Sequence, residues 1–138
     1  MNNTNLHQRG MTLMSLITAV AIVAILTMFA SVNYSEFQQR ARRMEAKSAL
    51  RQISELQERH YVTNFTYTND LTRLGFPGNQ TESGLYALSV PIANAAGFQA
   101  VAVPAPGSPQ ANDDDCQQFT IDDQNVRAST PDPDGKCW

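Results

Sequence analysis

The stretch that decides the fold is MTLMSLITAVAIVAILTMFASV, residues 11–32, which carries no charged side chain. As an α-helix with a rise of about 1.5 Å per residue, it would be roughly 33 Å long. The hydrocarbon core of a bilayer is about 30 Å thick, so the sequence predicts that residues 11–32 cross a membrane. Strong helix formers follow, and a single helix is therefore predicted from Thr12 to Tyr61.

Two different apolar faces follow one another along this predicted helix. At about 100° per residue, Phe37, Ala41 and Met44 share one face. The side chains of a second set cluster on nearly the opposite face: Ala46, Ala49, Leu50, Ile53, Leu56 and His60. This change of face favours a stem that packs in a membrane or filament core and then on a globular head. Two unrelated amphipathic helices are the alternative.

The residues before the apolar stretch indicate its orientation and processing. Arg9 and the amino terminus precede it, and positive charge stays on the cytoplasmic side, so the carboxyl end is predicted to be exported. A secretory signal is cut after its apolar segment, whereas the only good processing candidate here, Gly10, comes before it. Cleavage at Gly10 would keep the helix attached to the exported part. A plain single-span anchor is the alternative.

The carboxyl half predicts a small antiparallel sheet. Strands are expected at Gly84–Ile92, Gly97–Val103 and Gln117–Ile121, with a short fourth at 126–129. Consecutive strands joined by loops favour a meander, which gives an α+β fold. Pro91 suits an edge strand, because proline cannot donate to a neighbouring strand.

Composition and charge exclude several functions. The net charge is −3, and residues 61–138 carry three basic against nine acidic side chains, which supports DNA binding only weakly. The basic stretch from Arg40 to Arg51 is interpreted mainly as a solvated face. Packing against acidic surfaces of neighbouring subunits, and contact with phospholipid headgroups or DNA, are the alternatives. The acidic clusters at 113–115 and 122–134 are interpreted as solvated too, because DPDGK lacks the Glu that closes a calcium loop. With no catalytic spacing or phosphate loop, neither an enzyme nor a cofactor or metal is predicted.

The leader and helix resemble those of type IV pilins and the related pseudopilins. The resemblance implies that a prepilin peptidase cuts between Gly10 and Met11 and methylates Met11. It also implies three parts: a leader at 1–10, a membrane and filament-core half of the helix at 11–35, and a periplasmic or extracellular head at 36–138. The implied fold is a long amino-terminal helix packed on a small antiparallel β-sheet.

The two cysteines support the same reading. Cys116 and Cys137 form an even pair downstream of a membrane-inserting segment, which predicts one disulfide in an oxidising compartment. A paired-cysteine carboxyl region, together with QERHY at 57–61 and the CW ending, resembles minor pilins of the PilE-like group.

Filament packing is expected along the apolar stretch, where helices leave lipid for an equally apolar bundle and close packing must decide the register. The expected packing residues are Leu13, Leu16, Ile17, Ala19, Val20 and Val23. The family usually has Glu at the fifth mature position, where this chain has Ser15. A subunit with nothing ahead of it would not need that carboxylate, so a pilus-tip or rarely inserted subunit is predicted.

The resemblance implies a minor pilin that primes or caps a type IV pilus and serves twitching motility, adhesion or DNA uptake. Its partners would be other pilins through the helix, the prepilin peptidase, the inner-membrane assembly platform and the inner membrane before assembly. It would lie in the inner membrane first and in the extracellular pilus afterwards. The alternatives are a type II secretion pseudopilin and a DNA-receptor minor pilin for natural transformation.

Overall fold

One long helix and one sheet form the regular core of the protein. The computed structural model describes residues 12–132 and 135–138, without the side chains of 28–33. Helix α1 runs Leu13–Asn64, close to its predicted bounds. It ends without glycine: Phe65 takes the left-handed conformation (φ 55°), and its N–H donates to the Tyr61 carbonyl oxygen at 2.8 Å.

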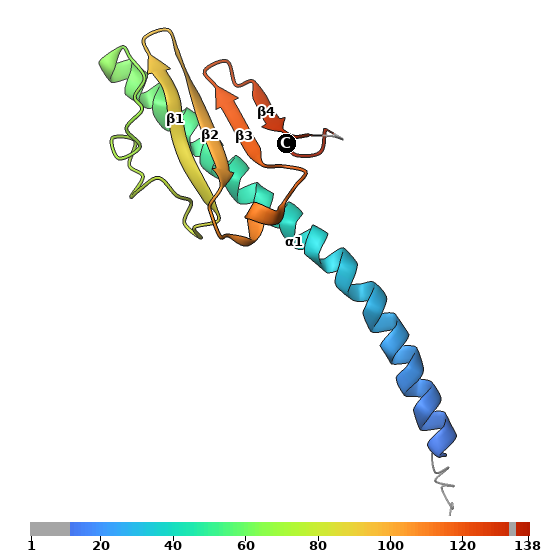
Figure 1. The fold of residues 1–138 in the computed structure, drawn as a ribbon. Coiled ribbons are helices and arrows are strands. Elements are labelled where there is room, and N and C mark those ends of the chain that lie inside the picture. Colours follow the sequence, from blue (N-terminus) through green and yellow to red (C-terminus); the bar gives the residue numbers. More distant parts are fainter. Residues whose placement is uncertain (1–11, 133–134) are drawn as a thin grey trace, which may run out of the picture. The chain divides into compact units, whose positions relative to one another are not determined.

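The sheet is a four-stranded antiparallel meander with the order β1-β2-β3-β4. Its strands are β1 (Tyr86–Asn94), β2 (Gly97–Pro104), β3 (Gln118–Asp122) and β4 (Arg127–Thr130), so each predicted segment overlaps a strand. Figure 1 shows these strands laid against the carboxyl-terminal half of α1. The predicted α+β fold, a long helix on an antiparallel sheet, is confirmed.

Backbone irregularities fall where the side chains favour them. Pro91 lies in edge strand β1, at a shift of register between Ser89 and Ile92. Asn125, in the turn between β3 and β4, takes the left-handed conformation (φ 60°), which asparagine tolerates better than most residues. The proline-rich loop after β2 is not wholly irregular, because Pro109–Asn112 forms a short 3-10 helix, η1.

The hydrophobic core lies between α1 and the sheet. Ala46, Leu50 and Ile53 of α1 are fully buried, as the second apolar face predicts. The sheet contributes Tyr86, Leu88, Phe98, Ala100, Ala102, Phe119 and Ile121. Burying this apolar surface is the main force that holds helix and sheet together.

The loop between α1 and β1 is held by a buried amide that the sequence analysis did not single out. The Gln57 side chain is fully buried. Its amide donates to the Thr68 carbonyl oxygen, and its oxygen accepts the Thr68 N–H at 3.0 Å. Both polar ends are therefore satisfied, and the loop is fixed to the helix.

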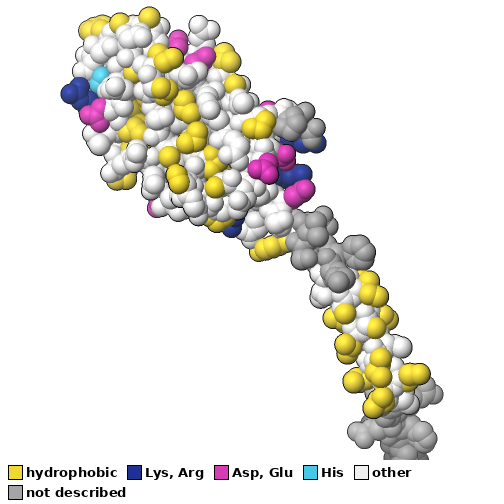
Figure 2. All heavy atoms as spheres, viewed as in Figure 1, with side chains coloured by type: hydrophobic (Ala, Val, Ile, Leu, Met, Phe, Trp, Pro, Cys, Tyr) yellow, Lys and Arg dark blue, Asp and Glu magenta, His cyan; other side chains and the backbone are white. Residues whose placement is uncertain are grey.

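By its contacts the chain divides into two compact units, Met1–Phe37 and Gln38–Trp138. In the first unit, every described side chain of α1 is exposed. Figure 2 shows hydrophobic side chains gathered along this part of the helix. The second unit holds the core, the sheet and the disulfide.

Candidate functional site

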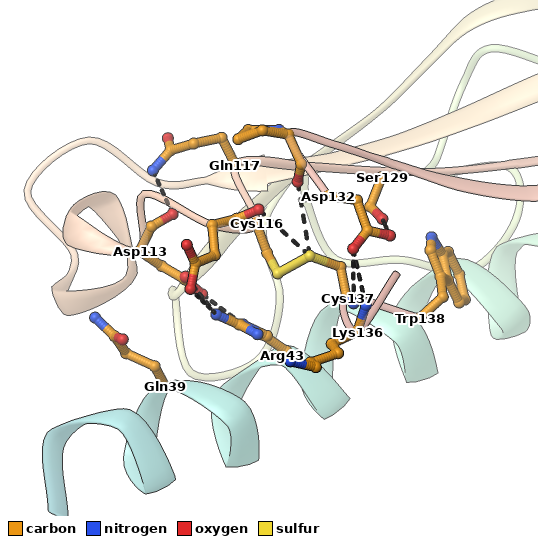
Figure 3. The surroundings of a disulfide bond; sticks show 12 residues. Gln39, Arg43, Asp113, Cys116, Gln117, Ser129, Asp132, Lys136, Cys137 and Trp138 are labelled. Carbon is orange, nitrogen blue, oxygen red and sulfur yellow. Dashed lines mark hydrogen bonds and ion pairs between the residues drawn. A yellow bond between two sulfur atoms is a disulfide. The ribbon is translucent and has the colours of Figure 1, made fainter. Parts of the chain in front are cut away.

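The carboxyl-terminal edge of the second unit is organised around a disulfide (Figure 3). Cys116 and Cys137 are bonded, with their Cα atoms 5.8 Å apart, and both are buried. The bond ties the segment after β4 to the start of β3. The cysteine pair singled out in the sequence is therefore joined, and it constrains the chain around β4.

A buried ion pair links the helix to the loop before β3. Arg43 donates from Nε to Asp113 Oδ2 at 2.7 Å and from Nη2 to Oδ1 at 2.6 Å. Both side chains are almost fully buried. The hydrogen bond with Asp113 raises the pKa of Arg43, although burial opposes it. Such a bidentate pair fixes the position of the loop on α1.

This pair belongs to a larger buried polar network. The Gln110 amide donates to the Tyr86 hydroxyl at 2.8 Å and to Asp113 Oδ2 at 3.2 Å. Burial raises the pKa of Tyr86 to about 12, so its hydroxyl stays protonated at neutral pH. Among the described buried side chains, only Gln110 Oε1 has no hydrogen-bond partner. The network holds η1 against the helix and β1.

The end of the chain is ordered by one aspartate. Asp132 accepts from the Ser129 hydroxyl at 2.7 Å and from the backbone N–H of Lys136 at 2.9 Å and of Cys137 at 3.3 Å. The Ser129 hydrogen bond is the largest cause of a lowered pKa for Asp132. The carboxylate thus acts as a local cap for the turn that precedes Cys137.

An aromatic and a cationic group meet beside this turn. The Arg127 guanidinium lies 5.8 Å from the centre of the Trp138 ring. Trp138 also packs edge-on against Phe119, with ring centres 6.0 Å apart, and its indole N–H donates to the Ala128 carbonyl oxygen. A cation over a partly buried indole is an arrangement that can contact both phosphates and bases.

Two cations on α1 form what we call the basic flank, Lys47 and Arg51. Burial lowers the pKa of Lys47, and repulsion from Arg43 and Arg51 adds to this, whereas Asp132 acts in the opposite direction. Arg51 is exposed. The basic flank therefore carries positive charge next to the turn that Asp132 organises.

The predicted packing residues of the first unit are all exposed in the structure. Leu13 is 77% exposed and Val20 is 62% exposed. The remaining members are also exposed: Leu16, Ile17, Ala19 and Val23. The Ser15 hydroxyl donates to the carbonyl oxygen of Thr12, the residue before α1, at 2.8 Å. The structure therefore leaves these side chains available to other molecules, and their role in packing stays a prediction.

Three further expectations concern processing, the membrane and metals. The predicted cleavage between Gly10 and Met11 lies outside the described residues. For the expected span at 11–32, no helix made of described residues is both long and apolar enough to cross a membrane. Within the same residues, no group of three or more His, Cys, Asp or Glu side chains could hold a metal ion.

The interpretation of the charged stretches was wrong for one residue in each. Arg43 and Asp113 were assigned to solvated faces, yet they form the buried ion pair. Arg43 lies three and seven residues before Ala46 and Leu50, which places it on the buried face of α1. That spacing could have identified Arg43, but the sequence offers no signal that selects Asp113 from its neighbours.

Comparisons of the sequence find pilins. The model of a family described as type IV minor pilin ComP, DNA uptake sequence receptor, matches residues 32–120. The type IV major pilin protein PilA of Myxococcus xanthus (strain DK1622) is 30% identical over 115 residues, which are 80% of this chain and 51% of PilA. The chain thus spans about half the length of this curated relative.

Solved pilin structures share the fold. The non-core minor pilin PilV of Neisseria meningitidis has a TM-score of 0.55 and 21% identity, over 68% of this chain and 88% of PilV. A type IV pilin from Shewanella oneidensis has a TM-score of 0.52 and 26% identity, over 72% of this chain and 97% of that chain. The long helix packed on an antiparallel meander is therefore an arrangement that solved pilins also have.

Proposed function

Because the chain belongs to the type IV minor pilin family, we propose that it is a structural subunit of a type IV pilus, a minor pilin that primes or caps filament assembly. The family and the fold are structural rather than enzymatic. The observation that carries the proposal is the exposed apolar helix of the first unit, where even Ile17 is 52% exposed. Contiguous exposed apolar surface of this kind marks an interaction site.

We infer the localisation, processing and assembly of the chain from its family. The family implies a membrane stage and then an extracellular pilus. We place the precursor in the inner membrane with its carboxyl end in the periplasm. A prepilin peptidase then cuts between Gly10 and Met11 and methylates Met11, and the assembly platform inserts the helix among those of other pilins. Ser15 favours a place at or near the pilus tip.

Mass spectrometry of sheared surface fibres tests this function. We expect the chain in the fibres, beginning at a methylated Met11 and scarce relative to a major subunit. The Gly10→Val chain should stay uncut and be absent from the fibres. If the Gly10→Val chain in membranes had the same mass as the cleaved parent chain, the proposed processing would be contradicted. A chain spread evenly along the pilus shaft would contradict the tip position.

The disulfide separates pilins from the first rival. A type II secretion pseudopilin, by resemblance, lacks a terminal disulfide. Among the described residues there is no free cysteine, because Cys116 and Cys137 are bonded. A free-thiol count on the denatured, unreduced chain should therefore give zero, and two free thiols would favour the pseudopilin.

A DNA-receptor role is the second candidate, favoured by the family match itself, since that family is described as a DNA uptake sequence receptor. Arg127 and Trp138 could supply a phosphate contact and a stacking ring. Full-length chain in detergent micelles should shift labelled genomic duplex, with an affinity that falls as salt rises. Arg127→Gln should weaken this binding. Arg59→Gln, an exposed site near the carboxyl-terminal end of α1, is the matched control and should leave the binding unchanged. Equal losses in both variants would exclude Arg127 as a specific contact.

A further inference from the structure

A groove of about 720 Å³ lies between α1 and the loop that precedes β1. The helix lines it with Glu45, Ser48, Ala49 and Gln52, and the loop lines it with residues 75–82. We call this the acidic groove, because the described side chains that line it include Glu45 and Glu82 but no Lys, Arg or His. Its charge therefore favours a cationic occupant.

The walls of the acidic groove are fixed in advance. Glu45 accepts the Ser83 N–H at 3.2 Å and the Ser83 hydroxyl at 2.6 Å. Burial would raise the pKa of Glu45, but these hydrogen bonds outweigh it and lower the pKa, so the carboxylate is ionised at neutral pH. Leu88 donates its N–H to the Asn79 carbonyl oxygen at 2.7 Å, which attaches the loop to β1. A preformed site loses little entropy on binding.

The basic flank lies on the opposite flank of α1 from the acidic groove. Lys47 and Arg51 fall within the same two turns of the helix as the groove residues Glu45 to Gln52. At about 100° per residue, the groove residues of α1 and the basic flank lie roughly a third of a turn to either side of the buried face that contains Leu50. Figure 1 shows the same division in the second unit: the loop before β1 runs along one edge, and the carboxyl terminus lies at the other. Two complementary surfaces thus face away from each other.

We propose that the acidic groove of one copy of this chain receives the basic flank, Lys47 and Arg51, of a second copy. Arg51 is exposed and can place a planar guanidinium between Glu82 and the amide groups of Gln52 and Gln80. The aromatic ring of Phe76 offers a surface on which that guanidinium can stack. The inference rests on the proposed function, since copies of a subunit that primes or caps a filament would gather at its tip and become neighbours there.

The geometry of this contact suits a filament. Each copy uses two different surfaces, so the contact is heterologous and leaves one groove and one basic flank open at the two ends of a row. Such a contact can be repeated without a two-fold axis. Two copies joined in this way present one open groove and one open basic flank to subunits of another kind, as expected of a chain that is scarce in the fibre.

Site-specific cross-linking of the full-length chain in detergent micelles tests the contact. A benzophenone amino acid at position 80 should give a covalent dimer whose cross-linked peptide contains Arg51. Glu82→Lys and Arg51→Glu should each lower the dimer yield about tenfold, equivalent to about 1.4 kcal/mol. Combining the two in one chain should restore it, because the charges are exchanged. Arg59→Glu, an exposed site on α1 outside both surfaces, should leave it unchanged.

Three results would overturn the inference. The doubly substituted chain could cross-link as poorly as the single variants, Arg59→Glu could lower the yield as much as Arg51→Glu, or the cross-link could map to residues 12–37. The proposed function fails separately: a chain that is absent from sheared fibres yet shows the charge-exchange rescue in micelles would contradict the pilus role and keep the contact.

Discussion

Helix α1 belongs to both units, and the two treat its apolar side chains in opposite ways. Leu16 and Val23 in the first unit are 52% and 58% exposed, whereas Leu50 and Ile53 in the second are fully buried. The hydrophobic effect acts on both sets. In the second unit these side chains are buried within the unit, whereas the described apolar side chains of the first unit are left exposed by their own unit. Substitutions can therefore disrupt the fold of the second unit and the assembly of the first unit separately.

The largest loss of stability is expected from breaking the buried ion pair. Asp113→Ala leaves the Arg43 guanidinium buried without its partner, which should lower the free energy of unfolding by about 3–5 kcal/mol. Urea denaturation followed by Trp138 fluorescence measures it. The double variant Arg43→Met with Asp113→Leu should recover most of the loss, because it removes both charges. A single variant as stable as the parent chain would show that the pair is not buried in solution.

A matched pair of leucines compares the two units directly. Leu50→Ala opens a cavity in the core and should lower the free energy of unfolding by about 2–5 kcal/mol. Leu16→Ala should change it by less than about 0.5 kcal/mol, since Leu16 is exposed, but should reduce the amount of chain in sheared fibres. Equal effects of both substitutions on unfolding would contradict the division into an inward-packed and an outward-packed part of α1.

Removing the disulfide is expected to act only on the second unit. Replacing Cys116 and Cys137 with serine should lower the free energy of unfolding by about 3 kcal/mol, because the unfolded chain gains the freedom of the opened loop. Chemical denaturation of the parent chain with and without reductant gives an independent measurement. The helical content of residues 13–37 should not change, and a loss of helicity there by circular dichroism of labelled segments would oppose this expectation.

The smallest effect concerns Asp132 and acid. Its pKa is lowered in the folded state, chiefly by the Ser129 hydrogen bond, so its stabilising effect is complete above the pKa of an unfolded aspartate, about 4. The effect is lost as the pH falls through the folded pKa. The Lys136 amide shift, followed by NMR, should titrate below pH 3.8. Asp132→Asn should abolish this titration, and a midpoint at or above 3.8 would be evidence against the capping role.

The spacing of apolar residues along the sequence predicted most of the fold, because α1 and the strands follow the helix and strand periods. Periodicity identified the buried stripe of α1 through Leu50 and Ile53, and alternation identified β1, whose Tyr86 and Leu88 are buried. Prediction failed where a charge is buried, because Arg43 and Asp113 are 70 residues apart and composition alone assigns charges to the surface.

Some of the candidate sites could be predicted from the sequence, and others could not. The cysteine pair and the exposed apolar helix could be chosen from the sequence, since each depends on residue type and order along the chain. The basic flank, Lys47 and Arg51, lies within a basic stretch that the sequence already shows. The acidic groove could not be chosen, because Glu45 and Glu82 come together only when the loop is attached to β1. The cation over Trp138 likewise needs β4 and the disulfide to bring Arg127 into place.

By itself, the order of residues determined that a long apolar helix carries a small antiparallel head with a cysteine-bounded end. That information is local, because helix and strand periods and turn residues act over a few positions. Only the tertiary structure decided which charges are buried and which complementary surfaces lie on opposite flanks of α1. Those outcomes depend on contacts between residues far apart in sequence, and their energies exist only once the core has brought the residues together.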